Sequence, residues 1–376
     1  MISYGRQNIV KSDINAVTKC LKSDLITQGD LPVKFEKLLS GYLGFKYCTT
    51  VSNGTSGMFL IAKLLNWKKG DLIAMPAVTF ISTASITEFC GAKPLFIDIN
   101  LTNYCIDTFK LESKLKKGLN IKSVVVTDYG GSAANWKHLL KLKKSYKFDL
   151  INDQCHALGT EYYSSKQYSS KYSDFSVLSF HPVKAITTSE GGAVLTNSKL
   201  YDKKIKLMRS HGIERGKDHW KYQVNYTGFN FRLSDLCCSL GISQFKRINK
   251  FIKKRRSIAK IYDNYFKSNE YLSTPYLSKE NISSYHLYPI RINFEKIKKN
   301  KDQLINFLMK KKIKLQFHYI PIFEFNYFKK KYKLKLKNYP NTKKFYNQVV
   351  SLPIYFELTT KKLKSILNNI DIFLKK

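Results

Sequence analysis

Short apolar runs alternate with helical stretches from about residue 50 to residue 200. Each run is apolar on both faces, which is typical of a strand buried between two layers. The runs are Leu72–Met75, Pro94–Ile97, Val124–Thr127, Leu150–Asn152, Phe175–Phe180 and Ala193–Thr196. The stretches between and beyond them predict helices over Ser56–Asn66, Thr79–Cys90, Ala133–Tyr146 and Lys199–Arg209. This alternation favours an α/β fold, with a mostly parallel sheet covered by helices.

The pattern changes after about residue 241. A long basic amphipathic stretch, Ser243–Phe266, precedes an apparent strand, Leu287–Phe294, and helices near Asp302–Lys311 and Thr360–Lys375. A chain of 376 residues also exceeds the usual size of one domain. We therefore predict a large domain with an N-terminal arm over residues 1–242 and a smaller α+β domain over residues 243–376.

Membrane-spanning and secreted classes do not fit the sequence. No apolar stretch approaches the ~20 residues that cross a bilayer. The N-terminus has no basic region followed by an apolar core, so no signal peptide is expected. The seven cysteines are scattered without C-x-x-C spacing, which favours neither a disulfide framework nor a metal site. We expect a cytoplasmic protein that does not bind membranes.

The net charge of +38 invites a nucleic-acid interpretation. However, only eight of the 65 basic residues are arginine, the side chain that phosphate and base recognition favours. The lysines are spread along the whole chain, as in a protein that uses lysine as its ordinary surface residue. We interpret the charge as a solvated surface and expect no nucleic-acid partner.

Two segments place reactive side chains beyond predicted strand ends, where α/β enzymes collect active-site residues. Lys184 follows the strand that ends at Phe180 and precedes a Gly-rich turn. Asp153 follows the strand Leu150–Asn152 directly, and His156 comes three residues later. Because an unpaired buried carboxylate is costly, Asp153 is expected to face a cation or a strong donor. A structural salt bridge is the alternative interpretation.

A third segment, Ser52–Ser56, opens a predicted helix with small polar residues. Small residues let the backbone approach an anion, and a helix N-terminus offers free N–H groups. An ordinary N-capped turn has a similar sequence, so the segment alone is weak evidence for an anion site.

Together, these segments resemble in order and spacing the DegT family, which are sugar aminotransferases of fold type I that depend on pyridoxal 5'-phosphate (PLP). The resemblance covers nearly the whole chain. Its further motifs are Leu25–Gly29, His156–Tyr162, Ser179–Val194, Ser210–Gly212, Asn230–Leu233 and Gln316–Tyr319.

The resemblance implies roles for individual residues. Lys184 would hold PLP covalently and shuttle a proton, Asp153 would pair with the pyridinium nitrogen, and His156 would lie beside the phenolic oxygen. Further cofactor contacts are implied for Phe80, Thr55, Ser56, Ser179 and Asn230 of the partner subunit. Substrate contacts are implied for Tyr4, Leu25, Ile26, Thr27, Gln28, His181, His318 and Tyr319.

The implied reaction moves an amino group from L-glutamate to the 4-keto carbon of UDP-2-acetamido-2,6-dideoxy-β-L-arabino-hex-4-ulose. Other UDP-, GDP- or dTDP-linked keto sugars remain open as substrates. The implied partners are this nucleotide sugar, glutamate and a second copy in a homodimer that shares its active sites.

Two competing functions are disfavoured by the same residues. Relatives that remove a sugar hydroxyl carry His in place of the lysine, so Lys184 favours aminotransfer. A purely regulatory or binding protein has no use for Lys184, Asp153 and His156 together. His181 is expected to be a substrate-loop residue and not the catalytic base.

Overall fold

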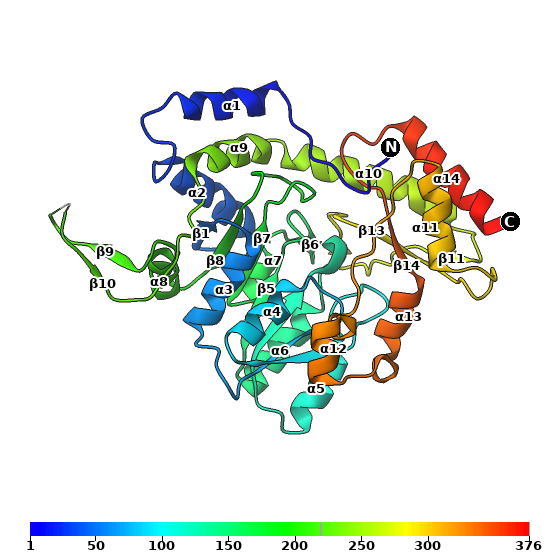
Figure 1. Cartoon of the computed structure of the whole chain (residues 1–376), viewed down its shortest axis with the longest axis horizontal. Helices are drawn as coiled ribbons and strands as arrows, with labels where there is room; N and C mark the ends of the chain where they lie inside the picture. Colours follow the sequence, from blue (N-terminus) through cyan, green and yellow to red (C-terminus); the bar gives the residue numbers. More distant parts are fainter. Residues whose placement is uncertain (219, 376) are drawn as a thin grey trace.

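Seven strands form one central sheet in the order β1-β8-β7-β5-β4-β2-β3 (Figure 1). The computed structural model describes residues 1–218 and 220–375. The strands are β1 (Tyr47–Val51), β2 (Leu72–Pro76), β3 (Lys93–Ile97), β4 (Ile121–Thr127), β5 (Asp149–Asp153), β7 (Phe175–Ser179) and β8 (Gly192–Thr196). Strands β2, β3, β4, β5 and β7 are parallel, whereas β8 is antiparallel to both of its neighbours, β7 and β1. The six predicted strands are therefore confirmed, and β1 is an addition.

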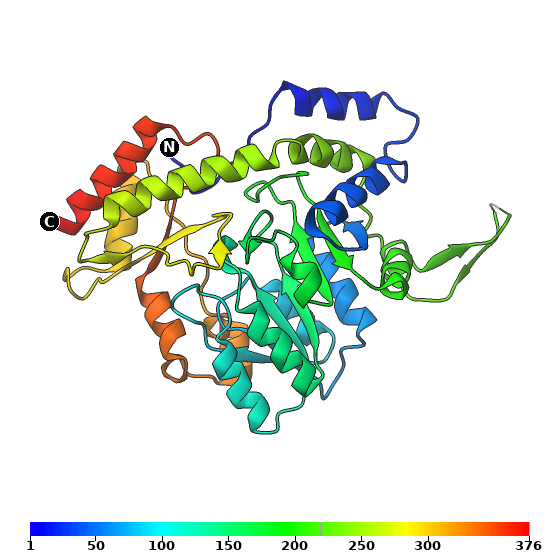
Figure 2. The same ribbon diagram turned by 180° about the vertical axis from the view of Figure 1, so that it is seen from behind.

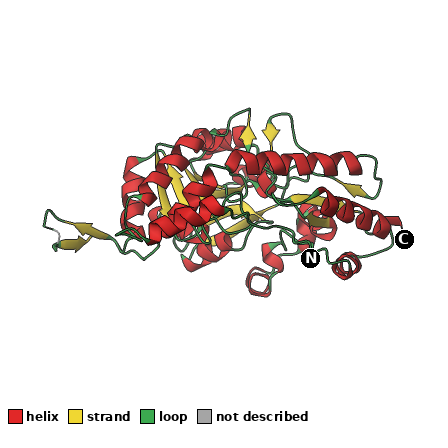
Figure 3. Cartoon of the chain, turned by 90° about the horizontal axis from the view of Figure 1, so that it is seen from above, coloured by secondary structure: helices red, strands yellow, loops and turns green. Residues whose placement is uncertain are grey.

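Helices cover both faces of this sheet, and Figure 3 shows the strands lying between them. Successive residues of β4 point to opposite faces, because side chains alternate along a strand. Val124 and Val126 join one core with the helices α5 (Thr108–Lys116) and α6 (Trp136–Tyr146). Val125 joins the other core with α3 (Gly54–Leu64), α4 (Ser82–Phe89) and α8 (Lys199–Arg209). This two-sided burial explains why the strands are apolar throughout.

Helices α3, α4 and α6 begin two or three residues from their predicted starts, and side-chain caps explain the difference for α3 and α6. Helix α3 begins two residues early because Asn53 caps it, accepting a hydrogen bond from the Ser56 N–H at 2.8 Å. Helix α6 begins three residues late because the Asn135 side chain accepts from the His138 N–H at 3.2 Å and so caps the helix there.

A separate core, called the small core below, lies around the small sheet β11-β13-β14. Its strands are β11 (Leu272–Ser273), β13 (Tyr288–Ile292) and β14 (Val349–Leu352), and its helices are α11 (Lys301–Lys310), α14 (Thr360–Lys375) and the second half of α10 (Ile248–Phe266).

Helix α10 joins the two cores and runs along the upper side of the molecule in Figure 2. Phe251 packs in a buried cluster with residues of the central sheet, such as Leu178, whereas Tyr262 packs in the small core. Residues beyond 242 also pack against the central sheet, since Phe323 and Phe328 belong to the core on the side of α3 and α4. The division at residue 242 remains a prediction.

The remaining α-helices and strands complete the chain. They are α1 (Lys11–Leu21), α2 (Leu31–Leu43), β6 (Glu161–Tyr162), α7 (Tyr168–Tyr172), β9 (Ile213–Arg215), β10 (Tyr222–Val224), α9 (Asp235–Phe245), β12 (Asn281–Ile282), α12 (Asn326–Tyr332) and α13 (Pro340–Gln348). The β9–β10 hairpin projects away from the body (Figure 1). Across the described ranges, no helix combines the length and apolar character needed to cross a membrane.

Candidate active site

The carboxyl ends of β5 and β7 border a cavity of about 690 Å³. Asp153, His156 and Lys184 all line it, so the structure brings together the three residues that were singled out from separate segments. Its size lies within the usual range for a small-molecule site.

Lys184 lies in the loop that follows β7, and the residue is half-buried. Its backbone N–H donates to the His181 carbonyl at 2.9 Å, which fixes the loop as a turn. Burial lowers the pKa of the Lys184 amine, while the nearby Cys155 and Asp153 side chains act in the opposite direction. A lysine with a lowered pKa has a larger neutral, nucleophilic fraction at a given pH.

Asp153 is the last residue of β5 and is buried at the cavity floor. Its carboxylate accepts hydrogen bonds from the Cys155 N–H at 3.2 Å and the Thr127 hydroxyl at 3.4 Å. Within the described part of the chain, no cationic side chain forms an ion pair with it. The expected alternative, a structural salt bridge, is therefore not what surrounds Asp153, and its carboxylate is available to a cationic group in the cavity.

His156 is buried, and both of its ring nitrogens have partners. Nδ1 lies 3.3 Å from the Gly130 backbone N, and Nε2 lies 3.0 Å from the Tyr319 hydroxyl. Burial, followed by the charges of Lys184 and His318, holds the pKa of His156 well below its ordinary value. The ring is thus neutral at neutral pH.

A candidate anion site lies at the start of α3. The first N–H groups of a helix lack intrahelical acceptors, and here they belong to Gly54 and Thr55, which line the cavity. Ser179, at the end of β7, adds a hydroxyl beside them. A side chain at Gly192 could not fit, because its Cβ would lie 2.7 Å from the Gly54 nitrogen. Glycine at this position lets β8 pack directly against the backbone at the start of α3.

Other predicted residues also reach the cavity. Phe80 keeps half of its surface exposed there, and its ring lies 6.0 Å from that of Tyr319. Tyr4, His181 and His318 line the same cavity, with the Tyr4 and His318 rings 5.3 Å apart.

Some predicted residues lie elsewhere in their own chain. Ser56 does not line the cavity; its hydroxyl accepts from the Asn53 N–H at 3.2 Å in the capping box and donates to the Asn53 carbonyl at 2.8 Å. Asn230 is exposed and outside the cavity, although the next residue, Phe231, accepts a backbone hydrogen bond from Ser52 at 2.8 Å.

Residues 25–28 are exposed and also outside the cavity. Their segment is held on the start of α9, where the Asp235 carboxylate accepts from the Gly29 N–H at 2.9 Å and the Leu31 N–H at 3.1 Å. In its own chain this loop lies outside the cavity, and the substrate contacts of residues 25–28 stay a prediction.

Thr127 and His286 are among the cavity residues that the sequence analysis did not single out. Thr127 ends β4 in the same way that Asp153 ends β5, so its strand-end position was an available signal. His286 precedes β13, and its ring lies 4.4 Å from that of His156. No local pattern marks His286, because its neighbour His156 is distant in sequence.

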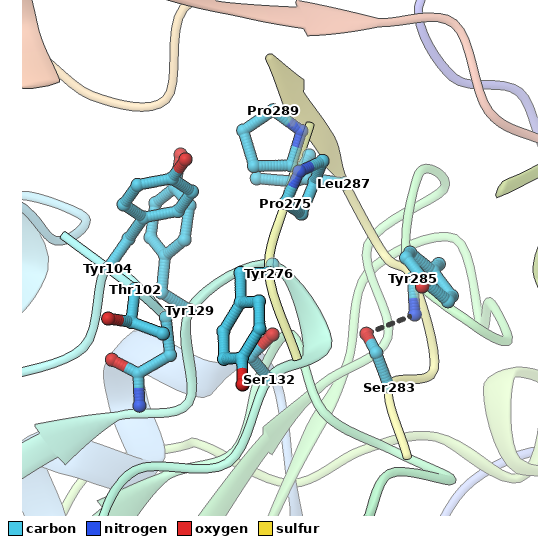
Figure 4. Close-up of a pocket in the computed structure, with 12 residues that line it drawn as sticks. Thr102, Tyr104, Tyr129, Ser132, Pro275, Tyr276, Ser283, Tyr285, Leu287 and Pro289 are labelled. Atoms are coloured by element: carbon cyan, nitrogen blue, oxygen red, sulfur yellow. Dashed lines mark hydrogen bonds between the residues drawn. The ribbon is translucent and has the colours of Figure 1, made fainter. Parts of the chain in front are cut away.

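A second pocket, shown in Figure 4, is too small to compete as a ligand site. It has a volume of about 10 Å³, enough for about one water molecule. Tyr104, Tyr129 and Tyr285 surround it, and the Ser283 hydroxyl oxygen accepts from the Tyr285 N–H at 2.9 Å.

Comparison with known proteins shows the family of the chain. Residues 7–371, nearly the whole chain, match a family of aminotransferases. The chain belongs to the DegT/DnrJ/EryC1/StrS aminotransferase family. The family predicted from the sequence is thus confirmed, and Lys184, Asp153 and His156 occupy one cavity of a DegT-family aminotransferase.

Relatives within the DegT family cover the full length of the chain. It is 39% identical over 378 residues to the UDP-4-amino-4,6-dideoxy-N-acetyl-beta-L-altrosamine transaminase of Campylobacter jejuni, with 100% of this chain and 98% of that protein covered. The Helicobacter pylori protein of the same name is 32% identical, with 98% and 96% covered. The solved structure of Helicobacter pylori PseC, described as an aminotransferase of pseudoaminic acid biosynthesis, matches with a TM-score of 0.93 at 32% identity, covering 100% of this chain and 99% of that one. The predicted fold class is confirmed by this match.

Proposed function

We propose that this protein is a PLP-dependent transaminase that moves the amino group of L-glutamate to the 4-keto carbon of UDP-2-acetamido-2,6-dideoxy-β-L-arabino-hex-4-ulose. The product is UDP-4-amino-4,6-dideoxy-N-acetyl-β-L-altrosamine, an intermediate of pseudaminic acid biosynthesis. The observation that carries the proposal is the meeting of Lys184, Asp153 and His156 in one cavity. Two relatives named for this product, at 39% and 32% identity, support the choice of substrate.

The residues present fit PLP. The cofactor needs an amine, a carboxylate for its ring nitrogen, an apolar face for its ring and an anion site for its phosphate. Lys184, Asp153 and Phe80 meet the first three needs, and the N–H groups at the start of α3 with the Ser179 hydroxyl meet the fourth. The Asp153 carboxylate is the most specific of these features, because it is buried and forms no ion pair in the described part of the chain, which leaves it able to face a cationic ligand.

Each residue contributes to catalysis through its own chemistry. When bound, PLP supplies an electron sink that makes the proton on the substrate's amine-bearing carbon removable. Lys184, with its lowered pKa, serves as nucleophile and then accepts and returns that proton. Asp153 keeps a ring nitrogen protonated by holding a negative charge beside it. Tyr4, His181 and His318 shape the region in which the sugar would lie.

The site is expected to be completed by a second copy of the chain. Asn230 and residues 25–28 are exposed and lie outside the cavity of their own chain. Phe229, next to Asn230, keeps 48% of its surface exposed, as a residue at an interface between copies would in one isolated chain. In a two-fold dimer, each copy would give these residues to its partner.

Mixing two inactive variants tests this shared site. If Asn230 serves the partner's cavity, a heterodimer of Lys184→Ala and Asn230→Ala has one site with both lesions and one site with neither. Activity is expected to rise to about half of the wild-type value per heterodimer. Mass spectrometry of differently tagged subunits would verify that heterodimers form. Inactive heterodimers would show that Asn230 serves its own subunit or no site at all.

A panel of nucleotide sugars tests the substrate. Glutamate-dependent amination is measured with UDP-, GDP- and dTDP-linked 4-keto-6-deoxy sugars at equal concentrations. We expect the kcat/KM for the UDP-linked acetamido sugar to exceed the others by about 100-fold or more, the discrimination that a few lost polar contacts produce. Equal or higher values with a GDP- or dTDP-linked sugar would move the protein to that alternative substrate.

A further inference from the structure

The contacts of His156 determine which of its ring nitrogens carries the proton. A backbone N–H can only donate, so the Gly130 N–H at 3.3 Å makes Nδ1 an acceptor. The ring is neutral, because burial and nearby cationic groups hold its pKa well below the ordinary value. The single ring proton must therefore reside on Nε2.

This assignment fixes the direction of the next hydrogen bond. With its proton on Nε2, His156 donates to the Tyr319 hydroxyl oxygen 3.0 Å away. The hydroxyl proton of Tyr319 then cannot be donated to His156 and is available to another acceptor. In the described part of the chain, the Tyr319 hydroxyl has no other hydrogen-bond partner. Burial, then the nearby Asp153 and Cys155, raises the pKa of this hydroxyl, so it keeps its proton.

The surroundings hold this arrangement in place. His286 packs against the His156 ring, with 4.4 Å between ring centroids. Asp128 anchors the loop that carries Gly130, since its carboxylate accepts from the Ala134 N–H at 2.8 Å and the Trp136 indole N–H at 3.0 Å. Gly130 itself has a φ of 62°, a conformation that suits glycine.

We propose that the Tyr319 hydroxyl is the hydrogen-bond donor that this wall of the cavity presents to a ligand oxygen, and that His156 is the positioning residue that sets its direction. The ligand oxygen is an anionic or carbonyl oxygen, either the phenolic oxygen of PLP or an oxygen of the substrate. The resemblance places His156 beside the phenolic oxygen, but both ring nitrogens of His156 are already engaged, so the donor proposed for this wall is Tyr319. The identity of the ligand rests on the proposed function, whereas the contact between His156 and Tyr319 does not.

The first experiment uses the protein without cofactor. Nitrogen NMR of protein labelled at histidine would report the protonation and tautomer of His156, with its signal identified from the His156→Gln variant. We expect a neutral ring with its proton on Nε2 at neutral pH. A proton on Nδ1, or a doubly protonated ring, would overturn the proposal. The result does not depend on whether the protein binds PLP.

The second experiment compares Tyr319→Phe with Tyr262→Phe. Tyr262 is a matched control, because its buried hydroxyl donates to the Pro353 carbonyl at 2.8 Å in the small core, away from the cavity. The visible absorbance of the PLP-loaded proteins is titrated with pH, and KM is measured for glutamate and for the keto sugar.

If the acceptor is the phenolic oxygen, Tyr319→Phe shifts the titration midpoint by about one pH unit, because a hydrogen bond to a charged oxygen is lost. If the acceptor belongs to a substrate, the midpoint stays and one KM rises about ten-fold. If Tyr319→Phe behaves like Tyr262→Phe in both measurements, the hydroxyl donates to neither ligand and the proposal is wrong.

Variants of His156 separate positioning from mere packing. His156→Gln retains an N–H that can donate to Tyr319, so its changes in titration midpoint and KM should be clearly smaller than those of a variant without a donor. His156→Leu removes the donor and should reproduce the change seen in Tyr319→Phe. Equal behaviour of the Gln and Leu variants would show that His156 does not direct Tyr319. If neither the wild-type protein nor any variant binds PLP, while the NMR result is as expected, the proposed function is wrong and the contact between His156 and Tyr319 still stands.

Discussion

The Lys184→Ala variant is expected to retain less than about 0.1% of wild-type aminotransferase activity while remaining folded, because one side chain supplies both the nucleophile and the proton acceptor. The variant should also lack the visible absorbance of a lysine-bound cofactor after incubation with PLP. Its fold should persist, since Lys184 makes no side-chain hydrogen bond or ion pair within the described residues. Initial rates with glutamate and the keto sugar, together with absorbance and circular dichroism spectra, measure these effects.

Lys301→Ala is the matched control for this variant. Lys301 is also a half-buried lysine, and burial lowers its pKa to about 8, but its amine donates to the Tyr346 carbonyl outside the cavity. Its replacement should leave activity within about two-fold of wild type, as for a substitution remote from the site. Activity above a few per cent in Lys184→Ala without an added amine would contradict the catalytic assignment.

The second large effect is expected for Asp153→Asn, which should slow the reaction by about 100-fold or more while PLP still binds. An amide has nearly the same shape but carries no charge, so it cannot stabilise a protonated ring nitrogen. The remaining oxygen of the amide can still accept from the Cys155 N–H, which now lies 3.2 Å from the carboxylate. The loss should therefore appear in kcat and not in the stability of the fold.

Asp149→Asn provides the comparison on the same strand. Asp149 begins β5 at the end opposite to Asp153, and its carboxylate accepts from the Ser123 hydroxyl at 3.3 Å. Its replacement should leave kcat nearly unchanged. A near-normal kcat in Asp153→Asn would mean that the carboxylate is structural.

The large sheet and its helices could be predicted because they depend on local patterns. Strands buried on both faces are continuously apolar, as in Val124–Thr127, and the bounds of Lys199–Arg209 agree with α8. Strand β1 was missed because its Cys48-Thr49-Thr50 centre is less apolar than the other strands. It is nevertheless buried, through pairing with β8, which is distant in sequence.

In the site, too, local patterns could be predicted, whereas contacts between residues distant in sequence could not. Asp153 and Lys184 could be found because each follows a strand, and parallel strands align their carboxyl ends. The contact between His156 and Tyr319 spans 163 positions, so no local pattern could predict it. The exposure of Asn230 and residues 25–28 also depends on tertiary packing. For residues 25–28, the Asp235 carboxylate accepts from the Gly29 N–H and fixes the loop.

The most direct test of the central claim is a two-step assay of the PLP-loaded protein at stoichiometric concentration. L-Glutamate is added first without any sugar, and we expect about one equivalent of 2-oxoglutarate per site together with loss of the visible absorbance. After removal of glutamate, the UDP-linked 4-keto sugar is added. The absorbance should return as about one equivalent of the 4-amino sugar forms. No 2-oxoglutarate in the first step, or no amino sugar in the second, would contradict the assignment of this protein as a sugar aminotransferase of this specificity.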